Sequence, residues 1–355
     1  MRMRTQIRPA DRPPLGALAR RVIAVLALAA LGPGVAAQRA PPLPIDALGT
    51  LARQGGGFEE AGPVDGGPGY RGSLLAYRHA GLRLKLLVAE PLAPPPPSGW
   101  PVLVANHGFH PDPPRYGITP AGRDWRPGDY YRPVPSAYVA AGFLVLMPDY
   151  RGHNSSEGRE FTLSMLSSSW YTEDVLALLA ALPNLPPRFR ADLRNVFMWG
   201  HSLGGEISLR ALLAAPAVRG ASLWSTVGGD VWEQAWRASR EQLVGTDSPA
   251  VDKPRLQALR RDIAALAGGP YDSDAREPRR ALRRLGTPLM LQHAVADPAT
   301  DVRWSLRIAH ELARRELPYE LHVLPGKDHF FQGEQFDAAV ARDVAFFRRL
   351  MDPPR

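Results

Sequence analysis

The stretch NVFMWGHSLGGEIS (Asn195–Ser208) places Ser202 between two glycines at the end of an apolar run. We predict a sharp turn that joins the strand NVFMW to a helix beginning near Leu203. Large side chains at Gly200 and Gly204 would clash there, because the turn brings the helix hard against the strand. The turn would hold the serine hydroxyl out of the sheet, beside the positive end of the helix. The alternative is a serine that caps an ordinary helix.

The segments around this turn alternate between short apolar runs and helical patterns. This alternation is typical of parallel strands that are buried on both faces and joined by crossover helices. With an opening hairpin of SLLAY and LRLKLLVAE, six further strands give a predicted sheet of eight: PVLVAN from Pro101, FLVLMP from Phe143, NVFMW from Asn195, ASLWSTV from Ala221, PLMLQ from Pro288 and YELHVL from Tyr319. Helices are predicted over Ser136–Ala141, Trp170–Leu182, Leu203–Leu213, Val302–Leu317 and Phe336–Met351.

An insertion over residues 230–285 interrupts this rhythm. It is longer than one crossover and contains DVWEQAW and KPRLQALRRDIAALAGG, which predict two amphipathic helices. We interpret it as a helical cap over the carboxyl edge of the sheet. A peripheral helical decoration, away from any site, is the alternative.

The first 37 residues differ in character from the rest of the chain. Six arginines precede an apolar run from Val22 to Leu31 that is too short to span a bilayer. Small residues at Val35 and Ala37 fit a cleavage site, so we predict a signal peptide over 1–37 and an exported protein, periplasmic or secreted. A retained membrane anchor is the alternative. Residues 38–69 are rich in proline and glycine and predict an extended tether, followed by one domain over 70–355.

Composition limits the partners. Loss of residues 1–37 removes six arginines and one aspartate, which lowers the formal net charge from +8 to +3. The remaining basic residues are spread along the chain, which argues against nucleic-acid binding. The absence of cysteine excludes disulfides, thiolate nucleophiles and thiolate metal sites. We expect no cofactor and no stable membrane span in the mature form, and the sequence leaves the oligomeric state open.

A serine hydroxyl becomes a nucleophile when an imidazole, oriented by a carboxylate, takes its proton. Asp297 lies in the loop after the strand PLMLQ, and His329 lies in the loop after the strand YELHVL. Asp301 competes for the acid role, but it directly precedes a predicted helix and is better placed as its cap. We therefore predict Ser202, Asp297 and His329 as the catalytic residues.

Attack by serine places negative charge on the substrate oxygen, so hydrogen-bond donors must surround that atom, each worth roughly 3 kcal/mol. The Leu203 N–H at the helix start is one predicted donor. The second is expected from the sequence HGFHP after the strand PVLVAN: the Phe109 N–H, with the His107 ring as substitute. His107 with His110 and Asp112 could also form a metal cluster, but their spacing matches no firm template.

These motifs together resemble the α/β-hydrolase superfamily. Over roughly Tyr70 to Met351, the pieces HGFHP, DYRGHNSSEG, GHSLGG, HAVADPATDV and LPGKDHFF are similar to the catalytic domain of the prolyl oligopeptidase family and its esterase relatives. The resemblance implies an α/β-hydrolase fold and acyl transfer through an ester on Ser202, and it implies that the DYRG loop is structural. Peptidases of that family commonly carry an amino-terminal β-propeller; only the tether and one hairpin precede the core in this sequence, so we do not expect a dedicated dipeptidyl peptidase.

The leading hypothesis is therefore an exported serine hydrolase that acts on the ester or peptide acyl bonds of small or exposed substrates. Esterase and peptidase share this machinery, and the sequence does not separate them. Trp232, Trp236 and the arginine-rich loop from Pro111 to Tyr131 could line the substrate pocket, although packing roles fit them equally well. A noncatalytic hydrolase fold that serves as a binding module of the cell envelope is the alternative from another class.

Overall fold

The computed structural model describes residues 40–51, 55–119, 122–123, 131–215, 218–241 and 253–352. Within these residues, nine strands form one sheet in the order β1-β2-β3-β7-β4-β8-β9-β10-β11. Their bounds are β1 Glu59–Gly62, β2 Tyr70–His79, β3 Leu82–Pro91, β4 Trp100–Asn106, β7 Leu144–Asp149, β8 Ala191–His201, β9 Gly220–Trp224, β10 Leu289–Ala294 and β11 Tyr319–Leu324. A separate two-stranded ribbon joins β5 (Ile118–Thr119) to β6 (Gly122–Arg123).

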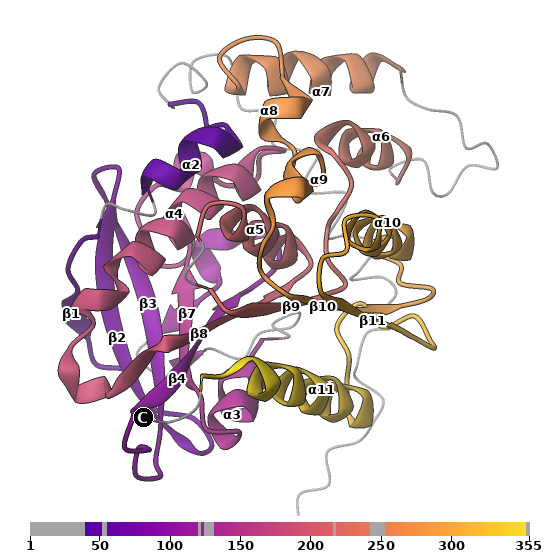
Figure 1. Ribbon diagram of the computed structural model, residues 1–355. Helices are drawn as coiled ribbons and strands as arrows, with labels where there is room; N and C mark the ends of the chain where they lie inside the picture. The colour runs from indigo at the N-terminus through magenta and orange to yellow at the C-terminus, as the bar shows by residue number, and fades with distance from the viewer. Residues whose placement is uncertain are drawn as a thin grey trace, which may run out of the picture.

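The sheet is antiparallel at one edge and parallel through its centre. Strands β1, β2, β3 and β7 pair antiparallel in succession, and every pairing from β7 to β11 is parallel. Because helical crossovers connect the parallel strands, both sheet faces are covered: α4, α5 and α10 lie on one side, with α3 and α11 on the other (Figure 1). Their bounds are α3 Pro133–Ala140, α4 Ser167–Ala181, α5 Leu203–Leu212, α10 Val302–Ala313 and α11 Glu334–Leu350.

The strand β8 shows why apolar runs mark this architecture. Val196 and Met198 are buried in the core under α4 and α5, whereas Phe197 and Trp199 are buried in the core under α3 and α11. Successive side chains of a strand point to opposite faces, so a central strand must be apolar at every position. The predicted strands and helices match the observed elements, with boundary shifts of a few residues.

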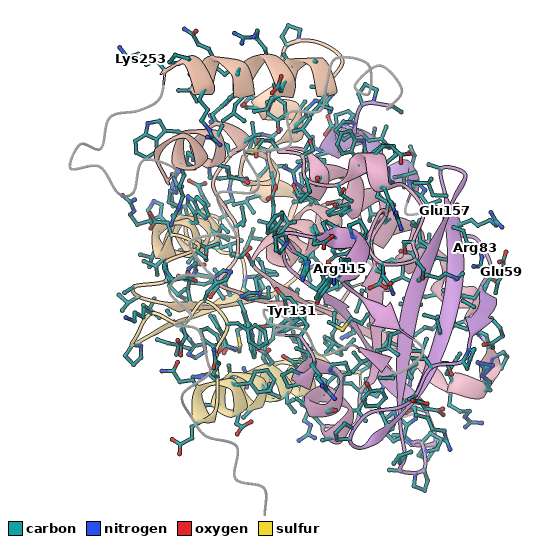
Figure 2. All side chains as sticks on the ribbon, turned by 180° about the vertical axis from the view of Figure 1, so that it is seen from behind. Glu59, Arg83, Arg115, Tyr131, Glu157 and Lys253 are labelled. Atoms are coloured by element: carbon teal, nitrogen blue, oxygen red, sulfur yellow. The ribbon has the colours of Figure 1, made fainter. Side chains whose placement is uncertain are left out.

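The segment predicted as an extended tether is partly ordered, which corrects two expectations. It contains α2 (Ile45–Leu51) and β1, and β1 raises the sheet from the predicted eight strands to nine. Ile45 and Leu48 are buried in the core beside α4. At the sheet edge, Glu59 accepts hydrogen bonds from Arg78 and Arg83, at 3.3 and 3.0 Å (Figure 2). Packing and ion pairing with distant residues thus order a segment whose own composition favours coil.

The insertion contains both predicted helices, α6 (Val231–Glu241) and α7 (Lys253–Leu266), followed by the short turns α8 (Ser273–Arg276) and α9 (Pro278–Ala281). Residues 242–252 lie outside the described part of the chain. Val231, Ala235, Leu259 and Ile263 form a small apolar cluster with Trp170 at the start of α4. The insertion therefore packs beyond the helical layer formed by α4, α5 and α10 (Figure 1).

The predicted signal peptide lies wholly outside the described residues. In the portion that the structure does describe, no helix combines the length and apolar character needed to cross a bilayer.

Candidate active site

The turn between β8 and α5 places Ser202 in a strained backbone conformation. Its φ is +56° and its ψ is −120°, a region that residues with a Cβ atom rarely adopt. A Cβ atom on Gly204 would lie 2.0 Å from the Asn106 carbonyl oxygen, and one on Gly200 would lie 2.4 Å from the Gly204 oxygen. The two glycines therefore permit the close approach of helix and strands that the sequence predicts.

Backbone hydrogen bonds hold this turn in place. The Ser202 N–H donates to the Trp224 carbonyl at 3.0 Å, and the Val227 N–H donates to the Ser202 carbonyl at 3.0 Å. Leu203 is the first residue of α5, so its N–H has no acceptor within the helix and adds to the positive end of the helix dipole. A developing oxyanion beside Ser202 would meet that donor.

Asp297 and His329 are brought together from the loops after β10 and β11. The His329 Nδ1 atom lies 2.8 Å from the Asp297 Oδ2 atom, and the carboxylate is fully buried. Asp297 also accepts from the backbone N–H groups of Ala299 and Thr300, at 2.7 and 3.0 Å, and from the Thr300 hydroxyl at 2.9 Å. Four donors therefore fix the orientation of one carboxylate.

Burial by itself would raise the pKa of Asp297. The charge of His329 and its hydrogen bond outweigh burial, and together with the Thr300 N–H they hold the pKa well below its ordinary value. The acid is thus ionised at neutral pH and accepts the Nδ1–H of His329. This arrangement leaves Nε2, the other ring nitrogen, as the basic atom.

Asp301, four residues after Asp297, has a structural role. Asp301 caps α10, accepting a hydrogen bond from the Arg303 N–H at 2.9 Å, and its carboxylate also pairs with the Arg303 guanidinium. The sequence-based choice of Asp301 as a helix cap is confirmed.

Ser202 and His329 are linked through His201, the last residue of β8. The His201 and His329 rings lie 4.5 Å apart between centroids, and the His201 Nε2–H donates to the His329 carbonyl at 2.8 Å. Within the described residues, the Ser202 hydroxyl and the His329 ring form no direct hydrogen bond. In free enzymes such bonds are often long and tighten once substrate binds.

The loop after β4 lies against Ser202. A Cβ atom on Gly108 would lie 3.0 Å from the Ser202 Cβ atom and 2.4 Å from the Tyr131 hydroxyl. The His107 ring is fully buried, stacks on Tyr150 at 4.3 Å and donates through Nδ1 to the Gly108 carbonyl at 2.8 Å. A ring in this position is poorly suited to donate to a substrate, so the geometry favours the Phe109 N–H over the His107 ring.

The alternative metal cluster gains no support. The His110 Nδ1 atom accepts a hydrogen bond from the Asp112 N–H at 3.1 Å, and the His110 ring stacks on Tyr116. In the described ranges, no group of three or more histidine, aspartate or glutamate side chains is placed to hold a metal ion.

The structure adds Tyr131 and Thr300 to the residues predicted around the site. Tyr131 lies in the middle of the molecule, whereas the labelled Glu59 and Arg83 lie at its periphery (Figure 2). It ends a stretch rich in arginine, glycine and proline that carries no recognisable period, so no sequence signal marks it. Thr300 follows Asp297 by three residues, the spacing at which a side chain can bond back to the start of a turn.

The predicted pocket residues Trp232 and Trp236 line a groove of about 340 Å³ between α6 and α7. Asp230, Glu233, Leu256 and Arg260 complete its walls. The Arg237 guanidinium of α6 donates to the Pro298 carbonyl at 3.1 Å, which connects α6 to the loop that carries Asp297. Residues 120–121 and 124–130 of the loop from Pro111 to Tyr131 lie outside the described part of the chain, so a lining role there stays a prediction.

Comparisons with known proteins agree with this architecture. A family model described as the alpha/beta hydrolase family matches residues 102–343. The uncharacterized peptidase YtmA of Bacillus subtilis (strain 168) is 24% identical over 262 residues, which cover 72% of this chain and 85% of YtmA.

Solved structures share the fold at low sequence identity. The acylaminoacyl peptidase of Pyrococcus horikoshii superposes with a TM-score of 0.57 at 17% identity, covering 81% of this chain but 42% of the peptidase. Dipeptidyl peptidase 4 of Porphyromonas gingivalis gives a TM-score of 0.58 at 17% identity, covering 79% of this chain and 36% of that protein. Acetyl xylan esterase 1 from Thermoanaerobacterium sp. JW/SL YS485 gives 0.56 at 14% identity, covering 94% of this chain and 99% of the esterase. The chain thus spans less than half the length of the two peptidases and nearly all of the esterase.

Proposed function

Since the chain belongs to the alpha/beta hydrolase family, we propose that it is a serine hydrolase that cleaves ester or peptide acyl bonds through an acyl-enzyme intermediate. Ser202 is the nucleophile, His329 the general base and acid, and Asp297 the residue that orients His329. The observation that carries this proposal is the 2.8 Å hydrogen bond between a buried, ionised Asp297 and the Nδ1 atom of His329.

The reaction proceeds in two acyl transfers. The Ser202 oxygen attacks the substrate carbonyl while the His329 Nε2 atom takes the hydroxyl proton. The imidazolium then returns this proton to the leaving alcohol or amine as the carbon–heteroatom bond breaks. Water attacks the resulting ester by the same route, giving its proton to Nε2, and the Ser202 hydroxyl is restored. Asp297 stays ionised throughout and stabilises the imidazolium.

Two backbone donors support the charge that develops on the carbonyl oxygen. The Leu203 N–H stands at the start of α5, and we assign the second donor to the Phe109 N–H. The loop that carries Phe109 packs against the Ser202 side chain at Gly108, which supports this assignment. A fixed donor at such a position contributes roughly 2.7–4 kcal/mol to the transition state.

Substrate choice between esters and amides rests on the leaving group and the pocket. Purified protein should be assayed with p-nitrophenyl esters of increasing acyl length, beside aminoacyl and prolyl p-nitroanilides. We expect ester hydrolysis that disappears in Ser202→Ala. Amide turnover comparable to ester turnover would assign the protein to the peptidases, and undiminished activity of Ser202→Ala would refute the proposed nucleophile.

We further propose that the protein is exported, on the strength of the arginines and the short apolar run within residues 1–37. The test is amino-terminal sequencing of the protein recovered from a cell fraction outside the cytoplasm. We expect a new terminus following Ala37. An intact amino terminus on membrane-bound protein would instead identify a retained anchor.

A further inference from the structure

The sheet order poses a distance problem for the site. Ser202 follows β8, His329 follows β11, and β9 and β10 lie between these two strands. Neighbouring strands are 4.7–4.9 Å apart, so the two strand ends are separated by roughly 14 Å. The loop over residues 325–333 must therefore fold back across the ends of two strands, and a loop of this kind needs anchors to hold a side chain in place.

A hydrogen-bonded chain connects that loop to the other loops of the site. The Gly108 N–H donates to the Tyr131 hydroxyl oxygen at 2.8 Å, and the Tyr131 O–H bonds the His201 Nδ1 atom at 2.5 Å. The His201 Nε2–H then donates to the His329 carbonyl at 2.8 Å. Four segments that are distant in the sequence thus meet through one buried histidine and one buried tyrosine.

The donor and acceptor of each hydrogen bond between Tyr131, His201 and His329 can be assigned. A carbonyl can only accept, so His201 carries its proton on Nε2, and its Nδ1 atom accepts from Tyr131. Burial lowers the pKa of His201 far below its usual value, with a smaller contribution from the nearby His329, so the ring stays neutral. The His329 carbonyl thus requires the tautomer with the proton on Nε2, and the Tyr131 hydroxyl stabilises that tautomer by donating to Nδ1.

Aromatic side chains pack around the hydrogen-bonded residues Tyr131 and His201. Phe330, the residue after His329, is 5% exposed, and its ring lies 5.1 Å from that of His201 and 5.5 Å from that of Tyr131. The His201 ring therefore cannot swing away without opening a packed interior. His329 is held at two points, its ring by Asp297 and its carbonyl by His201.

We propose that His201 is a positioning residue for His329, and that Tyr131 keeps His201 in the tautomer this task requires. Because His201 directly precedes Ser202, its bond to the His329 carbonyl sets the spacing between the nucleophile and the base. This inference rests on the proposed function of Ser202 and His329. It adds a role for His201, the residue before the serine. In this role His201 neither touches the substrate nor exchanges a proton with it.

The matched variants His201→Gln and His201→Asn test the proposal. The glutamine amide N–H reaches the place of Nε2 and can still bond the His329 carbonyl, whereas the shorter asparagine reaches only the place of Nδ1. We expect His201→Asn to lower kcat by about tenfold to a hundredfold with KM changed by less than about threefold, because misplaced reacting groups slow chemistry more than binding. His201→Gln should recover most of the wild-type kcat. Equal rates in the two variants would overturn the proposal.

A second pair keeps the test decisive if either histidine variant fails to fold. Tyr131→Phe removes the hydroxyl that donates to the His201 Nδ1 atom, while Tyr138→Phe removes another buried hydroxyl, which donates to Asp343 instead. We expect kcat to fall in Tyr131→Phe and to stay near the wild-type value in Tyr138→Phe. The thermal unfolding of each variant, measured in parallel, shows whether it is folded. A kcat in Tyr131→Phe matching that in Tyr138→Phe would contradict the proposal.

The rate of labelling by a fluorophosphonate separates this inference from the proposed function. Wild-type protein that is not labelled, or Ser202→Ala that is, would refute the nucleophile itself. Wild-type protein labelled at the same rate as His201→Asn would leave the nucleophile in place and refute the positioning role. We expect labelling of His201→Asn to slow by the same factor as its kcat.

Discussion

Asp297 and Asp301 lie four residues apart, yet their surroundings give them different chemistry. The Asp297 carboxylate is fully buried, accepts hydrogen bonds from the His329 ring and from two backbone N–H groups, and stays ionised. Asp301 is partly exposed and caps α10. Position relative to the strand end and the helix start was sufficient to separate them in the sequence, because a cap precedes its helix directly.

The two acids provide a matched pair of substitutions. Asp297→Asn should lower kcat by roughly 10³- to 10⁴-fold, because the amide no longer selects the His329 tautomer with a free Nε2. Asp301→Asn should stay within about threefold of wild type, since asparagine is also a good helix cap. Steady-state hydrolysis of a p-nitrophenyl ester measures both. Comparable losses in the two variants would show that the wrong aspartate has been assigned.

Position after a recognisable strand, in the order typical of this architecture, predicts Ser202, Asp297 and His329 as the reacting residues, and the structure brings Asp297 and His329 within 2.8 Å of each other. It did not predict Tyr131, whose position depends on a contact with His201, 70 residues further along the chain. His201 was not among the predicted site residues, and the structure places its two ring nitrogens on the Tyr131 hydroxyl and the His329 carbonyl. Such contacts arise from tertiary packing, and a local pattern cannot reveal them.

At the scale of elements, β8 and α5 can pack closely at their junction because Gly200 and Gly204 have no side chains. Gly204→Ala should lower the free energy of unfolding by at least about 1–3 kcal/mol, because the new methyl group would overlap the Asn106 carbonyl of β4. Gly49→Ala, in α2 with open space around the new atom, should raise stability by about 0.5–1 kcal/mol. Urea denaturation distinguishes the two, and a stable Gly204→Ala protein would contradict the close packing of strand and helix.

The helix α11 is tied to the sheet through one buried carboxylate. Asp343 accepts hydrogen bonds from Ser222 of β9 at 2.6 Å, Gln292 of β10 at 2.7 Å, Trp224 at 2.9 Å and Tyr138 of α3 at 2.5 Å. Burial raises the pKa of Asp343 to about 7 although these four donors oppose it. Below this pH the protonated carboxyl group can donate a hydrogen bond to the hydroxyl oxygen of Tyr138 or Ser222.

This raised pKa predicts a definite pH dependence. The folded protein holds the Asp343 proton more tightly than the unfolded chain, whose aspartates titrate near pH 3.9. The stability contribution of Asp343 is therefore complete below about pH 4, falls as the pH rises towards 7, and is constant above that. The difference in unfolding free energy between wild type and Asp343→Asn, measured by urea denaturation from pH 4 to 8, should follow this course. A difference that increases with pH would contradict it.

Most elements were predictable because a buried strand or an amphipathic helix carries its period in its own residues. The helix α2 and the strand β1 were missed because their order depends on distant partners. The Leu43 N–H donates to Glu173 at 2.8 Å, and the Ala40 carbonyl accepts from the Trp170 indole at 3.0 Å. Proline and glycine suggested coil locally, and contacts with α4 decided otherwise.

At the scale of the whole molecule, a buried charge network fastens the insertion to α5, the helix that follows Ser202. Arg210 of α5 pairs with Glu206 at 2.9 Å and lies 3.7 Å from Glu277, which precedes α9. Glu277 also accepts from the Tyr271 hydroxyl at 2.6 Å and from the Val231 N–H at the start of α6. The two parts of the fold therefore share one desolvated arginine.

Loss of Arg210 should lower the free energy of unfolding of the whole domain. Arg210→Met leaves two carboxylates buried without their cation, and we expect it to lower the free energy of unfolding by about 3–5 kcal/mol. Arg349→Met removes an arginine that is more than half exposed and pairs with Glu320, so it should cost less than about 1 kcal/mol. Guanidinium denaturation measures both. Equal stability of the two variants would show that the insertion is not fastened through Arg210.

The most decisive measurement is the site of covalent modification by a fluorophosphonate, determined by intact mass and peptide mapping. We predict a single adduct on Ser202, formed by the wild type, absent from Ser202→Ala and formed far more slowly by Asp297→Asn. A protein whose mass does not change, or an adduct on any other residue, would contradict the assignment of Ser202, His329 and Asp297 as the reacting group of this hydrolase.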